Sequence, residues 1–199
     1  MCAIFGALVF HHTHLNQTAL NGDLDRIWLR SHDRGRDGRG WLRVSSDGQT
    51  FASFDATRNE TGFRSQSPRV TACANATAII GNLRAEPTTE FVELKTAADQ
   101  QPYTCGQWSM VHNGTVANDK ELRTGQVRTS IDSAAIVEQL AIAGPGFNGF
   151  IKALNRVKGS FAILAIDHTD PGKLYAAANY RPIWYVTDGN ATYFASSRE

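Results

Sequence analysis

Short apolar runs separated by turn-forming residues indicate β-strands near both ends of the chain. The run from Ala3 to Phe10 is almost wholly apolar, as is typical of a strand covered on both faces. Two further runs flank Asp47-Gly48, a dipeptide that strongly favours a tight hairpin turn. The expected strands after Phe10 are Trp41–Ser46, Gln49–Phe54, Ala76–Ile80, Trp108–Val111, Ser160–Asp167, Lys173–Asn179, Pro182–Thr187 and Ala191–Ser196.

Apolar residues also recur at the three- and four-residue spacing of an amphipathic helix. Asn16–Arg30 and Asp132–Ala143 each carry such a stripe, and Gly144-Pro145 marks the end of the second. A third stripe ends at Gly159. Ile136, Val137 and Leu140 are expected to face inward. The other two stripes consist of Leu20, Leu24, Ile27 and Trp28, and of Phe147, Phe150, Ile151, Leu154 and Val157.

Strands at both ends, with helices between them, predict an α+β domain with largely antiparallel sheets. The strand from Phe161 to Ile166 is apolar at consecutive positions, so it must be covered on both faces, as in a sheet stacked on another sheet under helices. Arg34–Gly40 and Glu86–Gly106 are expected to be loops, the second with one helical turn. No repeat or linker interrupts the pattern, so residues 1–199 are expected to form a single domain.

Composition and charge exclude several classes of function. The 20 basic and 19 acidic residues give a net charge of +1, which provides no electrostatic footprint for nucleic acid or a membrane surface. No apolar run approaches the roughly 20 residues that a membrane helix requires. The apolar start lacks the basic segment of a signal peptide. We therefore expect a cytoplasmic protein without a membrane or nucleic-acid partner.

The candidate chemistry centres on the position of one cysteine. Cys2, Cys73 and Cys105 form no CxxC pair, so neither a disulfide framework nor a cysteine zinc site is expected. Removal of Met1 would leave Cys2 with a free α-amine, whose pKa of about 7.7–8.0 lets it serve as a base for its own thiol at neutral pH. One residue would then supply both nucleophile and base. The ordinary alternative is a cysteine that acts as a small buried apolar residue.

The segment Cys2-Ala-Ile-Phe-Gly6 resembles the Cys-Gly-Ile-Phe-Gly start of class II glutamine amidotransferases, which are N-terminal nucleophile hydrolases. Further segments follow in that family's order along essentially the whole chain. They are Arg34–Gly40, Gly81–Arg84, Val111–Gly114, Ile131–Ser133, Gly159–Ala162 and Tyr193–Ser197. The resemblance implies a four-layer αββα sandwich of the N-terminal nucleophile hydrolase type.

The same resemblance assigns the catalytic roles. It implies that Cys2 attacks the γ-amide of glutamine, which places negative charge on the carbonyl oxygen of that amide. The Asn113 side-chain amide and the Gly114 backbone N–H would form the oxyanion hole that stabilises this charge. The alternative for Asn113-Gly114 is a plain hairpin turn, which is the usual meaning of that dipeptide.

The resemblance also implies that two charged residues select the substrate. Arg84 would bind the α-carboxylate of glutamine through a two-pronged, charge-assisted pair, and Asp132 would bind its α-ammonium group. The alternatives are a surface arginine and a helix N-cap, respectively. Arg34 and Asp37 are expected to order the loop beside the nucleophile without touching substrate.

The chain departs from the family's pattern at several positions. Ala3 replaces a glycine and Asn82 replaces a histidine. Arg84 is followed by Ala-Glu-Pro-Thr-Thr, where the synthase branch of the family often has Trp-Ala-Thr-His. Relatives usually continue through further strand and helix beyond the position of Glu199, which predicts an exposed apolar surface near 191–197.

Two other groups of residues offer competing chemistry. His11-His12-x-His14 could hold a metal ion, but it has no acidic or cysteine partner beside it in the sequence, so no metal site is expected. Cys105 and His112 could imitate a Cys–His pair, but nothing in the sequence orients the histidine. No phosphate-binding loop is present, and no cofactor is expected.

The expected activity is therefore hydrolysis of glutamine through a γ-glutamyl thioester on Cys2. The released ammonia would pass to an acceptor on a synthase domain or partner. One alternative is an N-terminal nucleophile amidase that acts on another γ-glutamyl compound or a small amide. The other is an inactive relative kept as a regulatory subunit. The joint presence of Cys2, Arg84, Asn113, Gly114 and Asp132 favours an active enzyme.

Overall fold

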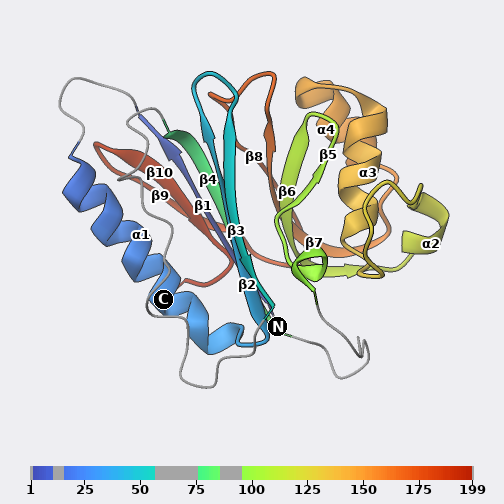
Figure 1. The fold of residues 1–199 in the computed structure, drawn as a ribbon, viewed down its shortest axis with the longest axis horizontal. Coiled ribbons are helices and arrows are strands. Elements are labelled where there is room, and N and C mark those ends of the chain that lie inside the picture. Colours follow the sequence, from blue (N-terminus) through green and yellow to red (C-terminus); the bar gives the residue numbers. More distant parts are fainter. Residues whose placement is uncertain (1, 11–15, 57–75, 86–95, 199) are drawn as a thin grey trace.

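Two β-sheets stack face to face at the centre of the protein in the computed structural model (Figure 1). The structure describes residues 2–10, 16–56, 76–85 and 96–198. Helix α1 (Gln17–Ser31) covers the outer face of one sheet, and helices α3 (Ala134–Ala143) and α4 (Gly146–Leu154) cover the outer face of the other. The predicted α+β fold, a four-layer αββα sandwich, is confirmed.

The ladders between the described strands are antiparallel, as expected. The larger sheet has the order β3-β2-β4-β1-β10-β9 and the smaller has the order β5-β6-β7-β8, so β4, β1, β6 and β7 occupy interior positions. The strands of the larger sheet are β1 (Ala3–Val9), β2 (Gly38–Ser45), β3 (Thr50–Asp55), β4 (Ala76–Arg84), β9 (Trp184–Thr187) and β10 (Ala191–Ala195). Those of the smaller sheet are β5 (Tyr103–Cys105), β6 (Trp108–Val116), β7 (Gly159–Asp167) and β8 (Tyr175–Asn179). Shorter described elements are α2 (Asp119–Leu122), η1 (His32–Arg34) and η3 (Ala97–Asp99).

Strand β7 shows how alternating side chains fill the core. Phe161 and Ile163 pack in the cluster beneath α3 and α4, whereas Ala162 and Leu164 pack between the two sheets. All four are buried, because the strand has helices on one face and a second sheet on the other. The consecutive apolar residues predict a strand covered on both faces, and this prediction is confirmed.

Helix α1 begins one residue after its predicted start, because Asn16 caps it. The Asn16 side-chain oxygen accepts a hydrogen bond from the backbone N–H three residues later, at 3.0 Å. Leu20, Leu24 and Trp28 are fully buried against the larger sheet, while Ile27 is partly buried at the edge of the same cluster. Burial of each large apolar side chain contributes about 1.5–3 kcal/mol to folding, so this stripe secures the outer helix.

Several strand boundaries differ from those that the pattern predicts. Strand β4 continues through Arg84 and strand β6 through Val116, although the polar segments at these ends suggest turns. Asn113 lies within the ladder, opposite Ala162 of β7, so its interpretation as a hairpin turn is wrong. Polar residues continue these strands because the neighbouring strands still pair with their backbones. Strand β2 likewise begins inside the expected loop, and β5 lies in a segment predicted to be a loop.

Candidate active site

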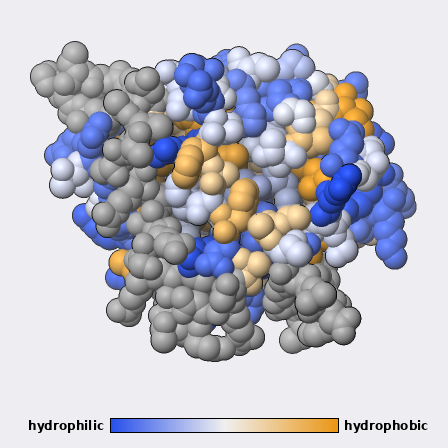
Figure 2. Space-filling model, in the orientation of Figure 1, coloured by the Kyte–Doolittle hydropathy of each residue, from blue (hydrophilic) through white to orange (hydrophobic). Residues whose placement is uncertain are grey.

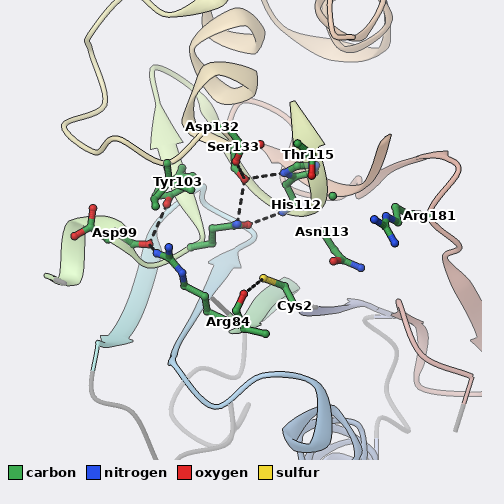
Figure 3. A pocket seen from close by; sticks show the side chains of 14 residues that line it. Cys2, Arg84, Asp99, Tyr103, His112, Asn113, Thr115, Asp132, Ser133 and Arg181 are labelled. Carbon is green, nitrogen blue, oxygen red and sulfur yellow. Dashed lines mark hydrogen bonds between the residues drawn. The ribbon is translucent and has the colours of Figure 1, made fainter. Parts of the chain in front are cut away.

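A pocket of 270 Å³ opens where the two sheets meet at one end of the sandwich (Figure 3). The five residues expected to carry catalysis and substrate binding all line it, although they come from distant parts of the sequence. They are Cys2, Arg84, Asn113, Gly114 and Asp132. The fold therefore brings this predicted set together in one place.

Strand alternation explains why three of these side chains meet. Ile4 packs between the sheets, so Cys2, two residues earlier, lies on the same inner face of the larger sheet. Ile80 of β4 also packs there, which gives Arg84 the same orientation. Asn113 follows the same rule in β6 of the opposing sheet, two residues after a valine that packs between the sheets. The thiol, the guanidinium and the amide are thus directed into the space between the sheets.

Cys2 is half-buried, and its Sγ donates a hydrogen bond to the carbonyl oxygen of Ala85 at 3.5 Å. Burial raises the pKa of the thiol above its ordinary value, and the Arg84 cation partly counteracts that rise. The protonated thiol is thus favoured in the resting site. A nucleophile in this setting requires a base close by, because thiols react as thiolates.

Arg84 is buried to 94%, since only 6% of it is exposed. Its Nη1 donates a hydrogen bond to the carbonyl oxygen of Asp99 at 2.8 Å, and the Tyr103 hydroxyl donates to the same oxygen at 3.0 Å. The alternative of a surface arginine is therefore wrong. The guanidinium is held at the pocket wall by the segment that leads into β5 (Figure 3).

Asn113 and Gly114 lie side by side near the end of β6. Asn113 is 4% exposed and lines the pocket. A Cβ atom on Gly114 would stand 1.9 Å from the carbonyl oxygen of Ser160 on β7, and the φ of Gly114 is +157°. Glycine is therefore required here for the close approach of two backbones.

Asp132 is buried beside the pocket and is anchored to β6. Its Oδ2 accepts a hydrogen bond from the backbone N–H of Val116 at 2.6 Å, and its Oδ1 accepts one from the Ser133 hydroxyl at 3.2 Å. The N-cap residue of α3 is Ser133. The interpretation of Asp132 as a helix cap is therefore wrong, because its carboxylate joins the α3 entry to the neighbouring strand.

A buried polar network supports the far wall of the pocket, and its members escaped the sequence analysis as site residues. The imidazole Nδ1 of His112 lies 2.7 Å from the Ser133 hydroxyl, and the Gln101 side-chain oxygen accepts from the His112 backbone N–H at 2.5 Å. Burial lowers the pKa of His112, which keeps the ring neutral near pH 7. The side chain of Cys105 instead donates to Gln126 at 3.3 Å and is not among the pocket residues, so no Cys–His pair is assembled.

Arg34 and Asp37 support the strands that carry the site. Arg34 Nη1 donates to the carbonyl oxygen of Ser196 at 2.7 Å, and the Ser196 hydroxyl accepts from the backbone N–H of Ile4 at 3.0 Å. The backbone N–H of Asp37 donates to the carbonyl oxygen of Arg84 at 2.9 Å. Neither residue lines the pocket, so both act on the ends of β1 and β4.

Arg181 is a pocket residue that no sequence signal indicates. It follows β8, and its Nε donates to the Ser160 hydroxyl at 3.4 Å. Tyr180 before it has a φ of +58°, a left-handed backbone that is uncommon for a residue other than glycine. In Figure 3, Arg84 and Arg181 lie on opposite sides of Cys2. The pocket thus holds two cationic side chains.

Two negative findings apply to the described part of the chain. Within it, no three His, Cys, Asp or Glu residues are grouped closely enough to hold a metal ion. The His11-His12-x-His14 segment lies outside the described residues. None of the described helices has the length and apolar character needed to cross a membrane.

Comparisons with known proteins identify the family of the chain. Residues 89–199 match a family described as a glutamine amidotransferase domain. The chain is 35% identical to 7-cyano-7-deazaguanine synthase 2 of Sulfurisphaera tokodaii over 94% of its length, and 32% identical to 7-cyano-7-deazaguanine synthase of Sulfolobus acidocaldarius over 98%. It covers only 41% and 43% of those two relatives, so they contain much additional sequence.

Similarity to solved structures extends to the whole fold. The glutamine phosphoribosylpyrophosphate amidotransferase of B. subtilis superposes with a TM-score of 0.69 over 98% of this chain and 42% of that chain, at 18% identity. At this identity the match concerns the fold alone, which is the four-layer αββα sandwich. The family match and the two curated relatives show that the chain belongs to the glutamine amidotransferases of class II, as its sequence motifs predict.

Proposed function

We propose that this protein hydrolyses the γ-amide of glutamine through Cys2, after removal of Met1, and delivers the ammonia to an acceptor. The observation that carries this proposal is the convergence of Cys2, Arg84 and Asn113 on one pocket between the two sheets. The pocket volume of 270 Å³ suits a small amino acid.

The proposed reaction begins with transfer of the Cys2 Sγ proton to the α-amine of the same residue. The thiolate then attacks the side-chain amide carbon of glutamine, and the electron pair of the C=O bond moves to oxygen. Asn113 Nδ2 and the Gly114 N–H donate hydrogen bonds to that oxyanion. Collapse of the intermediate breaks the C–N bond, and the Cys2 ammonium returns its proton to the departing nitrogen, which leaves as ammonia. Water then hydrolyses the thioester and releases glutamate.

Charge complementarity supports glutamine as the substrate. The buried guanidinium of Arg84 would pair with the α-carboxylate, and the Asp132 carboxylate would accept from the α-ammonium group. A free amino acid carries both charged groups beside the same carbon, whereas a glutamine residue within a protein carries neither. The two residues would therefore exclude protein amides.

An ammonia acceptor outside residues 1–199 is the second part of the proposal. The relatives named as 7-cyano-7-deazaguanine synthases are more than twice as long as the stretch they share with this chain. Apolar side chains are exposed on β9, the edge strand of the larger sheet, where Trp184, Tyr185 and Val186 are 45%, 75% and 63% exposed. A hollow of 330 Å³ lies between this strand, β10 and α1. We propose that a synthase domain or partner docks here.

Other apolar side chains also reach the surface. Figure 2 shows them over strands β2 and β3 in the middle of the view and over α4 at the upper right. Phe51 and Phe54 of β3 are 52% and 38% exposed, and Phe147 of α4 is 63% exposed. The β9 surface is preferred for docking because three consecutive residues of this edge strand are exposed apolar side chains, and all three line the hollow.

The direct test is glutamate release from glutamine by the processed protein, with Cys2→Ala and Cys105→Ala as matched variants. The proposal predicts that Cys2→Ala abolishes release and that Cys105→Ala leaves it intact. Faster hydrolysis of another γ-glutamyl compound than of glutamine would favour the amidase alternative. Absence of release by the processed wild-type protein, alone and with a candidate synthase, would favour the inactive relative.

A further inference from the structure

We propose that Asn82 is a further catalytic residue, whose side-chain amide donates a hydrogen bond to the Cys2 sulfur once that sulfur is a thiolate. This inference rests on the proposed function, in which Cys2 is the nucleophile. Asn82 lies in the Gly81–Arg84 segment, and the sequence alone gives it no role.

The placement of Asn82 in the sheet brings it to the sulfur. It lies on β4, two residues before Arg84, and pairs across the ladder with Ile4 of β1. Because side chains alternate along a strand, Asn82 shares the inner face of the sheet with Arg84 and Cys2. Only 1% of Asn82 is exposed, so its amide is enclosed between the two sheets.

The Asn82 amide has an unused donor in the resting structure. Its Nδ2 is buried and has no hydrogen-bond partner. Folded proteins rarely leave a buried donor unsatisfied, because the group has lost its bonds to water without replacement. Such a group is therefore a place to seek a function that the resting state does not display.

The hydrogen bond of the resting thiol explains what the spare donor can do. Cys2 Sγ donates its proton to the carbonyl oxygen of Ala85 at 3.5 Å. After the proton moves to the α-amine, the sulfur has nothing to donate, and the nearby carbonyl oxygen repels its negative charge. The Asn82 Nδ2 then gains an acceptor, so the same group that is unsatisfied beside the thiol is satisfied beside the thiolate.

This exchange of partners selectively stabilises the charged sulfur. Burial raises the pKa of the Cys2 thiol, whereas Arg84 and the Asn82 side chain lower it. The other charged groups at the pocket are Arg181 from the segment after β8, Asp132 from the entry to α3 and Asp99 from η3. The titratable side chains of Tyr103 and His112 line the pocket as well. Asn82 is an uncharged donor among them, so it favours the thiolate without attracting the α-carboxylate of the substrate away from Arg84.

The test replaces the amide with an apolar group of similar shape. In the processed protein, alkylation of Cys2 by iodoacetamide is followed from pH 6 to 10 in wild type and in Asn82→Leu, with each cysteine quantified by peptide mass spectrometry. We expect the midpoint of the Cys2 profile to move to higher pH, with alkylation at pH 7 about 10-fold slower for each unit of movement. Asn82→Asp, which places an acceptor at the same position, should move the midpoint further in the same direction.

Two controls separate this role from a structural one. Asn118→Leu is the matched variant, because the Asn118 amide is also buried but bonds to Arg156 and Lys158 at 3.0 and 2.9 Å. It should lower the melting temperature without moving the Cys2 profile. Asn82→Leu removes an unsatisfied donor and should leave the melting temperature unchanged or higher. The profile of Cys105 should be the same in all variants.

A Cys2 midpoint that stays at the wild-type pH in Asn82→Leu overturns the proposal. So does an equal movement of the Cys2 and Cys105 midpoints accompanied by a lower melting temperature, because that pattern reports loosening of the fold. The alkylation readout needs no glutamine. Failure of the proposed glutaminase activity would instead appear as absence of glutamate release by the wild-type protein.

Discussion

Individual polar residues define this site because they interrupt the apolar inner faces of the two sheets. Asn82, Arg84 and Asn113 occupy positions where alternation would otherwise place core side chains, and each is at least 94% buried. Burying polar groups is unfavourable unless they are paired, so their presence requires a compensating role. We interpret that role as binding and catalysis around Cys2.

Asn113→Ala should lower kcat for glutamine hydrolysis about 100- to 1,000-fold, with little change in KM. The reason is that an oxyanion donor acts on charge that develops only in the transition state. Steady-state kinetics of glutamate release provide the measurement. An increase in KM at unchanged kcat would show that Asn113 binds the substrate and does not stabilise the oxyanion.

Arg84→Ala should instead raise KM for glutamine about 10- to 100-fold, since a charge-assisted hydrogen bond to the α-carboxylate is lost in both the ground and transition states. Asp132→Asn should act in the same direction and is preferable to alanine, because the Asp132 carboxylate also bonds to the backbone of β6. Glutaramate, which lacks the α-ammonium group, provides the control. Its hydrolysis should be insensitive to Asp132→Asn.

The sequence predicts the reactive residues far better than their supports. Cys2, Arg84 and Asn113 stand in recognisable segments, so the motifs locate them. Gln101 reaches the site only because β5, β6 and α3 pack together, and it lies in no local pattern that indicates this. Ser133 belongs to a recognisable segment, but that segment does not predict its contact with His112. Contacts across long sequence separations are a property of the fold, which local patterns do not encode.

At the scale of secondary structure, the ends of β1, β4 and β6 position the chemistry. Strong periodicity predicts α1 well, and Asp47-Gly48 predicts the hairpin between β2 and β3. The third stripe is only partly right, because α4 ends at Leu154 and its Phe147 and Ile151 are exposed. The ends of β4 and β6 are missed because polar residues replace apolar ones there, which a local pattern interprets as turns. The same polar residues line the pocket, so these two boundary errors have a functional origin.

Gly114→Ala tests the close contact between β6 and β7. The added Cβ would stand 1.9 Å from a backbone oxygen, so the two strands must separate. We expect the free energy of unfolding to fall by about 1–3 kcal/mol, together with loss of glutamate release. Gly172→Ala is the matched control, because nothing lies within 4 Å of a Cβ at that position. Equal stability of the two variants in urea unfolding would contradict the observed geometry.

The buried network of His112 predicts an acid-sensitive junction between β6 and α3. Burial holds the pKa of His112 below its ordinary value of 6.5, and that of His168 is lowered for the same reason. As the pH falls, these histidines therefore bind protons at a higher pH in the unfolded chain than in the folded one. The free energy of unfolding should be constant above about pH 6.5 and decrease below it.

His112→Asn keeps a polar group near the Ser133 hydroxyl and removes the titration. Urea unfolding at pH 7.5, 6.5 and 5.5 should show a smaller loss of stability in this variant, by up to about 1.4 kcal/mol per pH unit below 6.5. His168→Asn should separately reduce the dependence of unfolding free energy on pH. Identical slopes in wild type and His112→Asn would show that His112 does not titrate differently on unfolding.

At the scale of the whole molecule, the two sheets differ in how their described surfaces are covered. Two of the described helices, α3 and α4, cover the smaller sheet, whereas α1 covers the larger one and β9 keeps apolar side chains exposed. The exposed apolar surface expected near 191–197 is centred on β9 and not on β10, because Ala191 and Tyr193 of β10 are themselves buried. That residues 1–199 form one domain remains a prediction.

Trp184→Asp tests the proposed docking surface. Basal glutamate release should be unchanged, because Trp184 lies outside the catalytic pocket. Stimulation by an added candidate synthase should be lost, since a charge on β9 opposes burial of this edge. Lys173→Asp, at an exposed position in the segment between β7 and β8, serves as the surface control. Fast, saturable turnover by the lone chain, unaffected by any synthase, would favour a self-sufficient amidase.

The most direct measurement of the central claim combines intact mass with labelling by a glutamine-like diazoketone. We predict that the active protein lacks Met1 and that one label is attached, on Cys2, with loss of glutamate release in proportion to labelling. Excess glutamine should protect against the label, and Cys2→Ala should take up none. Attachment of the label to Cys73 or Cys105, or full activity with Met1 retained, would contradict a nucleophile that uses its own α-amine as the base.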